Sequence, residues 1–160
     1  MDYVAKAKEI ATKAHTGQER WGGEPYITHP EAVAKAVSHI GPEFEATAWL
    51  HDALEDTKTT DQQIFDAGIP GDVVNAVILL THRPEQPYLD YILNLTEELH
   101  SRTHFQKSWY PCLDLGHVLS LAREVKKADL KHNLEASKGM KYKTSIRDKW
   151  MLSLWILENT

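Results

Sequence analysis

Residues 44–57 read FEATAWLHDALEDT, in which apolar residues give way to a cluster of ionisable side chains. The pattern predicts a helix over residues 43–56, and side chains four positions apart lie on one face of a helix. His51 therefore pairs with Glu55, and Asp52 pairs with Asp56 on the neighbouring face. Imidazole and carboxylate groups together suit divalent ions such as Mn, Fe or Zn. Taken alone, the segment predicts either a metal site or a solvated acidic helix end.

The position of the acidic residues adds an electrostatic argument for a metal ion. Asp52, Glu55 and Asp56 crowd the C-terminal end of the predicted helix. The helix dipole favours cations over anions at that end, so the three carboxylates oppose it. A bound divalent cation would remove the conflict.

A second predicted helix, residues 119–136, carries a carboxylate on its apolar face. The inner face of this helix consists of Leu119, Ala122, Val125, Asp129 and His132. A carboxylate in such a position must be paired or bind a metal, because burying a bare charge is too costly. Asp129 is therefore predicted either to form a salt bridge with a nearby Lys or Arg, or to bind a metal.

His29 lies next to Pro30 at the start of another predicted helix. Proline suits the first helical position, because its missing N–H would have no partner there. His29 is therefore held rigidly, and the sequence predicts either a plain capping histidine or a metal ligand.

The helical period recurs along the chain, with glycine and proline between the periodic segments. Further helices are predicted at residues 3–15, 29–40, 60–67, 70–80, 88–99 and 143–158, and no β-hairpin signal is present. A chain of 160 residues is long enough to bury one core. We predict an all-α fold, a compact bundle of about seven helices, in a single domain of residues 1–160.

Composition excludes several classes of partner. The net charge of -5 argues against binding to a nucleic acid polymer, which needs a basic surface. No apolar run approaches the roughly 18 residues of a membrane span, so we expect no membrane association. Cys112 is the single cysteine, which rules out an intrachain disulfide and favours a reducing compartment. The expected location is the cytoplasm.

Four segments follow one another along the chain: GQERWGGEPYITHPEAVA (17–34), AWLHDALEDTKTT (48–60), LTHRPEQPYLDYI (80–92) and AREVKKADLKHNLEAS (122–137). In this order they resemble the hydrolase domain of RelA/SpoT proteins, an HD-type metal domain. Because the chain is short, it is most similar to the stand-alone small alarmone hydrolases.

The resemblance implies a set of site residues. The implied ligands of one divalent ion, expected to be Mn²⁺, are His29, His51, Asp52 and Asp129. Glu55 and Asp56 fall on the acidic pair that positions and activates the attacking water. The implied substrate contacts are Arg20, Asn133 and, in a looser alignment, Arg83.

The implied reaction is hydrolysis of the 3′-pyrophosphate of ppGpp or pppGpp, which yields GDP or GTP and pyrophosphate. One alternative is an HD nucleotidase or phosphatase that acts on another nucleotide, such as NADPH or the adenine alarmone ppApp. A second alternative is a non-catalytic module that binds a nucleotide or a partner and keeps the HD fold.

Two features depart from the family pattern. Trp21 follows Arg20 where relatives often have another basic residue, so it is interpreted as a base-stacking residue or as packing under the loop. Residues 95–118 form a predicted insertion, which we interpret as a lid, an oligomer contact or an ordered surface segment. We interpret Trp150 as core and Lys126 as one of several solvated lysines.

Overall fold

The computed structural model describes residues 2–96, 110–111, 114–138, 140 and 144–160. The regular elements of these residues are helices, beside one isolated β-bridge between Glu19 and Pro25. The helices are α1 (Tyr3–Ala14), α2 (Thr28–Val37), α3 (Pro42–Leu50), α4 (Ala53–Asp56), α5 (Asp61–Asp66), α6 (Gly71–Leu80), α7 (Tyr88–Leu93), α9 (Leu115–Ala136) and α10 (Thr144–Asn159). The predicted all-α bundle is confirmed.

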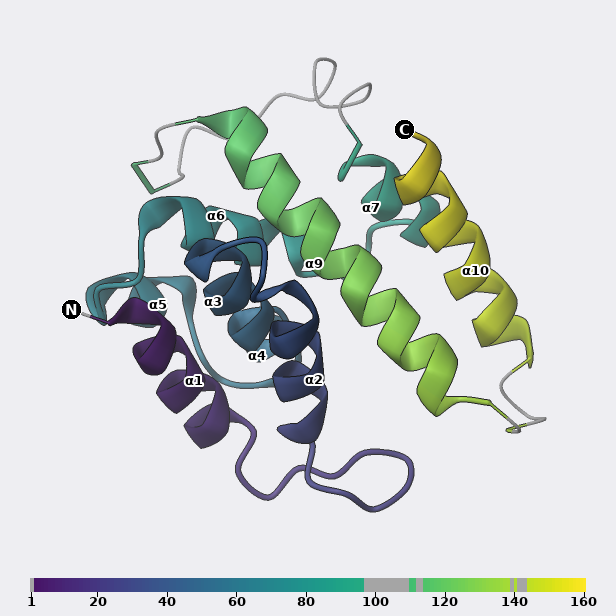
Figure 1. Ribbon diagram of the computed structural model, residues 1–160, viewed down its shortest axis with the longest axis horizontal. Coiled ribbons are helices and arrows are strands. Elements are labelled where there is room, and N and C mark those ends of the chain that lie inside the picture. Colours follow the sequence, from purple (N-terminus) through teal and green to yellow (C-terminus); the bar gives the residue numbers. More distant parts are fainter. Residues whose placement is uncertain (1, 97–109, 112–113, 139, 141–143) are drawn as a thin grey trace.

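Helix α9 is the centre of the bundle (Figure 1). It packs against α2, α3 and α6 on one side and against α10 on the other. Leu121, Ala122 and Val125 of α9 are fully buried, because they form the apolar stripe of a helix with neighbours on both sides. Among the described helices, none is long and apolar enough to cross a membrane.

Side-chain caps fix several helix starts. The Thr60 hydroxyl accepts a hydrogen bond from the Gln63 backbone N–H, and the Gln63 side chain accepts one from the Thr60 N–H. This capping box confirms the predicted start of α5. The Asp2 side chain caps α1 by accepting the backbone N–H groups of Val4 and Ala5, and the Asp114 side chain caps α9 by accepting that of Gly116.

The single helix predicted across residues 43–56 is interrupted, so that part of the prediction is wrong. Helix α3 ends at Leu50 and α4 begins at Ala53. Asp52 has φ −98° and ψ −4°, in the sparsely populated bridge region where many active-site residues lie. In a regular helix His51 and Asp52 would point about 100° apart. The interruption changes the angle between the two side chains, and both of them reach the His29 imidazole.

Two predicted boundaries around the insertion also differ. The helix predicted for residues 88–99 ends at Leu93, and Leu95 turns into the core and is almost fully buried. Helix α9 begins at Leu115, four residues before the predicted start, because Asp114 provides a cap there. Most of the predicted insertion, including residues 97–109, lies outside the described residues.

Replacing Leu121 by Ala should test the importance of the α9 contacts. The side chain is fully buried, so the substitution should lower the free energy of unfolding by about 2–5 kcal/mol through lost burial and a cavity. Met151→Ala on α10 is the control: Met151 is 56% exposed, and its loss should change stability by less than about 0.5 kcal/mol. Chemical denaturation of both variants measures the difference, and equal stabilities would contradict the central role of α9.

Candidate metal centre

Three predicted ligands from three helices meet at one point. His29 lies in the first turn of α2, His51 at the end of α3 and Asp129 in the middle of α9. One ligand atom of each lies within 4.8 Å of the others. The Nε2 atom of His29 is 3.2 Å from Nε2 of His51 and 3.1 Å from Oδ1 of Asp129. All three side chains are buried.

Asp52 adds a fourth oxygen to this group. Its Oδ2 atom lies 3.1 Å from Nε2 of His51 and 3.4 Å from Nε2 of His29. Burial alone would raise the pKa of Asp52, but the His51 and His29 imidazoles hold that pKa below its usual range. Two imidazoles and two carboxylates thus point their donor atoms at one small volume.

The hydrogen bonds behind the histidines fit this donor set. Nδ1 of His51 lies 2.7 Å from the carbonyl oxygen of Ala48, which can only accept, so Nδ1 carries a hydrogen. Because Nδ1 is engaged in that bond, Nε2 is left to face the other predicted ligands. In metal sites a histidine is commonly oriented in this way, by donating its other ring N–H to a carbonyl oxygen. Nδ1 of His29 lies 2.8 Å from Nδ1 of His132. The residues present therefore fit a divalent transition-metal ion.

Asp129 forms the salt bridge that the sequence analysis offered, and its other oxygen faces the predicted metal ligands. Its Oδ2 accepts a hydrogen bond from Nζ of Lys126 at 2.8 Å, while its Oδ1 faces the histidines and accepts from the Asn133 amide. Burial alone would raise the pKa of Asp129, but the Lys126 ammonium and the His29 imidazole hold it well below its usual range. The interpretation of Lys126 as a solvated lysine is wrong, since it is largely buried against Asp129.

Tyr26 is a site residue that the sequence analysis missed. Its hydroxyl lies 2.7 Å from Oδ2 of Asp52 and 2.9 Å from Oδ2 of Asp56, and it can donate its one proton to either. Burial, together with the charges of Asp52 and Asp56, raises the pKa of Tyr26, so the hydroxyl stays protonated. Tyr26 therefore links Asp52, a predicted metal ligand, to Asp56 of the acidic pair. Its place three residues before His29 was the available signal.

The acidic pair is held from two sides. Oε2 of Glu55 accepts a hydrogen bond from the His82 backbone N–H at 2.9 Å. Burial, followed by the charges of Asp52 and Asp56, raises the pKa of Glu55 despite that bond. The Gln18 side chain donates to the backbone carbonyl of Asp56 at 2.9 Å. These bonds fix the short segment that carries both carboxylates.

A cavity of about 360 Å³ opens onto the ligand group and contains most of the predicted site residues. Arg20 and Asn133 line it, as do His29, Asp52, Glu55, Asp56 and Asp129. The Arg20 guanidinium donates to Oδ1 of Asn133 at 3.0 Å and lies 3.1 Å from Nδ1 of His132. Arg83 is exposed on the loop between α6 and α7 and is not among the residues that line the cavity.

Two tryptophans from distant segments line the same cavity. The rings of Trp21 and Trp150 stack with their centroids 5.7 Å apart and their planes 16° apart. Trp150 packs against the core but is only partly buried, so its interpretation as a plain core residue is incomplete.

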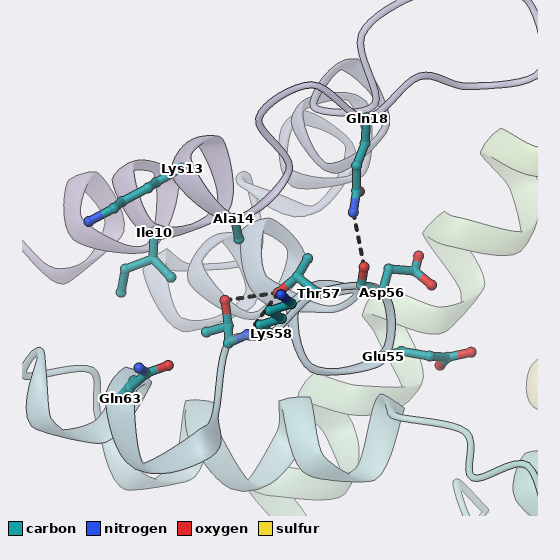
Figure 2. Close-up of a pocket in the computed structure, with 10 residues that line it drawn as sticks. Ile10, Lys13, Ala14, Gln18, Glu55, Asp56, Thr57, Lys58 and Gln63 are labelled. Carbon is teal, nitrogen blue, oxygen red and sulfur yellow. Dashed lines mark hydrogen bonds between the residues drawn. The ribbon is translucent and has the colours of Figure 1, made fainter.

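A second cavity, of about 880 Å³, lies on the other side of the segment that carries the acidic pair. It lies between α1, residues 55–59 and α5, with Ile10, Lys13 and Gln63 among its lining (Figure 2). Figure 2 shows that the carboxylates of Glu55 and Asp56 point away from Ile10 and Gln63. The carboxylates of Glu55 and Asp56 are therefore assigned to the cavity that contains the predicted metal ligands.

Metal binding is expected to displace a proton from His51 at neutral pH. Burial alone would lower the pKa of His51, but the charges of Asp52 and Asp129 raise that pKa to about 9. A metal ion needs the lone pair of Nε2, so binding below this pH releases the proton. Calorimetric titration of EDTA-treated protein with Mn²⁺ at pH 7.5, in two buffers of different ionisation enthalpy, should reveal release of about one proton per ion.

The raised pKa of His51 also predicts how the stability of the metal-free protein changes with pH. The folded state of the metal-free protein holds the His51 proton more tightly than the unfolded state does. Protonation of His51 therefore stabilises the metal-free protein fully below pH 6.5, and this stabilisation disappears as the pH rises through about 9. The apparent affinity for Mn²⁺ should rise over the same window. Equal titration enthalpies in the two buffers would contradict this assignment.

Comparisons with known proteins agree with the predicted resemblance. No protein-family model matches the chain. The guanosine-3′,5′-bis(diphosphate) 3′-pyrophosphohydrolase of Haemophilus influenzae is 51% identical over 57 residues, which cover 34% of this chain and 8% of that protein. The bifunctional (p)ppGpp synthase/hydrolase SpoT of Escherichia coli is 47% identical over 63 residues, or 38% of this chain and 9% of that protein. The matches thus span less than a tenth of these curated relatives.

The fold has a counterpart among solved structures. A metazoan orthologue of SpoT that hydrolyses ppGpp and plays a role in starvation responses is similar with a TM-score of 0.70 and 19% sequence identity. The similarity covers 98% of this chain and 85% of that one. This chain therefore shares its helical fold with that SpoT orthologue and, over about a third of its length, is similar in sequence to (p)ppGpp 3′-pyrophosphohydrolases.

Proposed function

We propose that this chain is a metal-dependent hydrolase that removes the 3′-pyrophosphate of ppGpp or pppGpp, giving GDP or GTP and pyrophosphate. The observation that carries the proposal is the meeting of two imidazoles and two carboxylates at one point, beside a cavity that two further carboxylates line. The named activity of the sequence relatives supports this substrate. We also propose that residues 1–160 form one hydrolase domain, with residues 95–118 as an insertion.

The proposed ion is Mn²⁺, held by His29, His51, Asp52 and Asp129. A mixed imidazole and carboxylate donor set supports an ion of this kind. When bound, a divalent ion of this kind lowers the pKa of water and withdraws charge from a phosphate oxygen.

The acidic pair is proposed to hold and deprotonate the attacking water. A base works best when its pKa lies near the working pH, and burial raises the pKa of Glu55 in that direction. Tyr26 orients Asp56 by its hydroxyl, and Gln18 holds the Asp56 backbone. Both carboxylates line the cavity that contains the predicted metal ligands, which supports catalysis over a binding module.

Arg20 and Asn133 are the proposed substrate contacts. Both line the cavity beside the ligand group, and the Arg20 guanidinium supplies a positive charge where phosphates would lie. Arg83 does not line the cavity, so the proposal assigns it no contact.

Purified protein with Mn²⁺ is expected to convert ppGpp to GDP and pyrophosphate, resolved by anion-exchange chromatography, and EDTA should stop the reaction. Parallel reactions with ppApp and NADPH test the alternative substrates. Asp52→Ala should abolish both Mn²⁺ binding and turnover, because it removes an oxygen from the ligand group. Glu135→Ala, at an exposed carboxylate on α9, should retain both. Full activity of Asp52→Ala would refute the mechanism.

Removing the acidic pair should separate catalysis from metal binding. Glu55→Gln and Asp56→Asn keep the size of the side chains, so the fold and the ligand group should persist. Each should lower kcat for ppGpp by at least about 100-fold, the usual scale for loss of a general base, while the stoichiometry of bound Mn²⁺ stays the same. If wild-type protein binds Mn²⁺ but turns over no nucleotide, the non-catalytic module becomes the better explanation.

A further inference from the structure

His132 lies beside the ligand group but is not one of the predicted ligands. It is on α9, three residues after Asp129, and its ring lies against the ring of His29, with the centroids 4.9 Å apart and the planes 35° apart. Nδ1 of His132 is 2.8 Å from Nδ1 of His29 and 3.1 Å from a terminal guanidinium nitrogen of Arg20. One ring nitrogen of His132 therefore contacts both a predicted metal ligand and an arginine.

The contacts of this nitrogen determine where the hydrogens lie. A guanidinium group can only donate, so Arg20 directs an N–H at Nδ1 of His132, and that nitrogen must carry a lone pair. Two ring nitrogens 2.8 Å apart share one hydrogen between them. Because Nδ1 of His132 is the acceptor, the shared hydrogen belongs to Nδ1 of His29.

The position of this hydrogen determines what the other side of the His29 ring can do. A neutral imidazole with its hydrogen on Nδ1 has its lone pair on Nε2. Nε2 of His29 is the atom that faces Nε2 of His51 and Oδ1 of Asp129. The Ala48 carbonyl has the same effect on His51, because it accepts the Nδ1 hydrogen of that ring. Each predicted histidine ligand thus has its own acceptor behind it.

The Arg20 side chain is held firmly enough to fix His132. It is only 6% exposed, and its other terminal nitrogen donates to Oδ1 of Asn133 at 3.0 Å. The Asn133 amide in turn donates to Oδ1 of Asp129. Arg20 therefore connects with two predicted ligands, with His29 through His132 and with Asp129 through Asn133.

We propose that His132 is a positioning residue of the metal centre, which accepts the Nδ1 hydrogen of His29 and so keeps the lone pair of His29 Nε2 directed at the ion. The inference rests on the ligand set of the proposed function and assigns a role to a histidine outside that set. What the position requires is an acceptor atom, and an aromatic ring alone is not sufficient. Asparagine can replace His132, because its Oδ1 is bonded to Cγ as Nδ1 of histidine is, whereas phenylalanine cannot.

NMR spectroscopy of the full chain, labelled with ¹⁵N in its histidines and treated with EDTA, tests the hydrogen positions without metal or turnover. The ¹⁵N shifts show which ring nitrogens carry a hydrogen, and the His132→Asn variant identifies the His132 signals. We expect a hydrogen on Nδ1 of His29 and on Nε2 of His132, with Nδ1 of His132 bare. A hydrogen on Nδ1 of His132 would overturn the inference.

Calorimetric titration with Mn²⁺ gives a second readout. His132→Phe keeps a ring but removes the acceptor, so it should weaken Mn²⁺ binding by about 10- to 100-fold, the usual effect of losing a group that orients a histidine ligand. His132→Asn should retain most of the affinity. His117→Phe is the matched control, because His117 is also on α9 but pairs with Glu43 and does not line the cavity; it should bind Mn²⁺ as the wild type does.

Two results of this titration would show that His132 only packs against its neighbours. One is wild-type Mn²⁺ affinity in His132→Phe, and the other is an affinity in His132→Asn as low as that in His132→Phe. Either result overturns the inference. If His132→Phe does not fold, the NMR measurement on the wild-type chain still decides the question.

The inference and the proposed function fail in distinguishable ways. Expected hydrogen positions and a loss of Mn²⁺ affinity in His132→Phe, together with no hydrolysis of ppGpp by the wild type, would refute only the proposed reaction. Hydrolysis of ppGpp by a wild-type protein whose His132 carries a hydrogen on Nδ1 would refute only the role of His132.

Discussion

The contact between Asp129 of α9 and His29 of α2 is the constraint on which the rest of the site depends. Oδ1 of Asp129 lies 3.1 Å from Nε2 of His29 in a buried environment, where an unpaired carboxylate would be very costly. Lys126 offsets that cost from one turn earlier on the same helix, by holding the other carboxylate oxygen. The central helix of the bundle is therefore fixed against α2 by the same groups that face the candidate metal position.

The interruption between α3 and α4 serves the same arrangement. A continuous helix would direct His51 and Asp52 to different faces, whereas the broken helix lets both reach His29. Tyr26 extends the arrangement to Asp56 through its hydroxyl. The ligand group and Asp56 are thus parts of one hydrogen-bonded unit, while Glu55 is held separately by the His82 backbone N–H.

Much of the fold and the site follows from the sequence. Helical periodicity, prolines at helix starts and the Thr60 cap predict an all-α bundle with most of its helices in place. The segments around His51 and Asp129 predict the chemical types of the candidate site, because a carboxylate on an apolar helix face must be paired or bind a metal. These signals are local: each depends on residues within a few turns of one another.

Several features of the site depend on contacts between distant segments, and these features were visible only in the tertiary structure. Sequence periodicity could not show that the helix breaks after Leu50, because the break is compensated by contacts with other helices. Nor could it show that Tyr26 contacts two aspartates, that Lys126 is largely buried, or that Trp21 stacks on Trp150. Each of these outcomes depends on the relative positions of packed helices. The sequence by itself determined the helices and the chemical types of the site, and packing determined which side chains meet there.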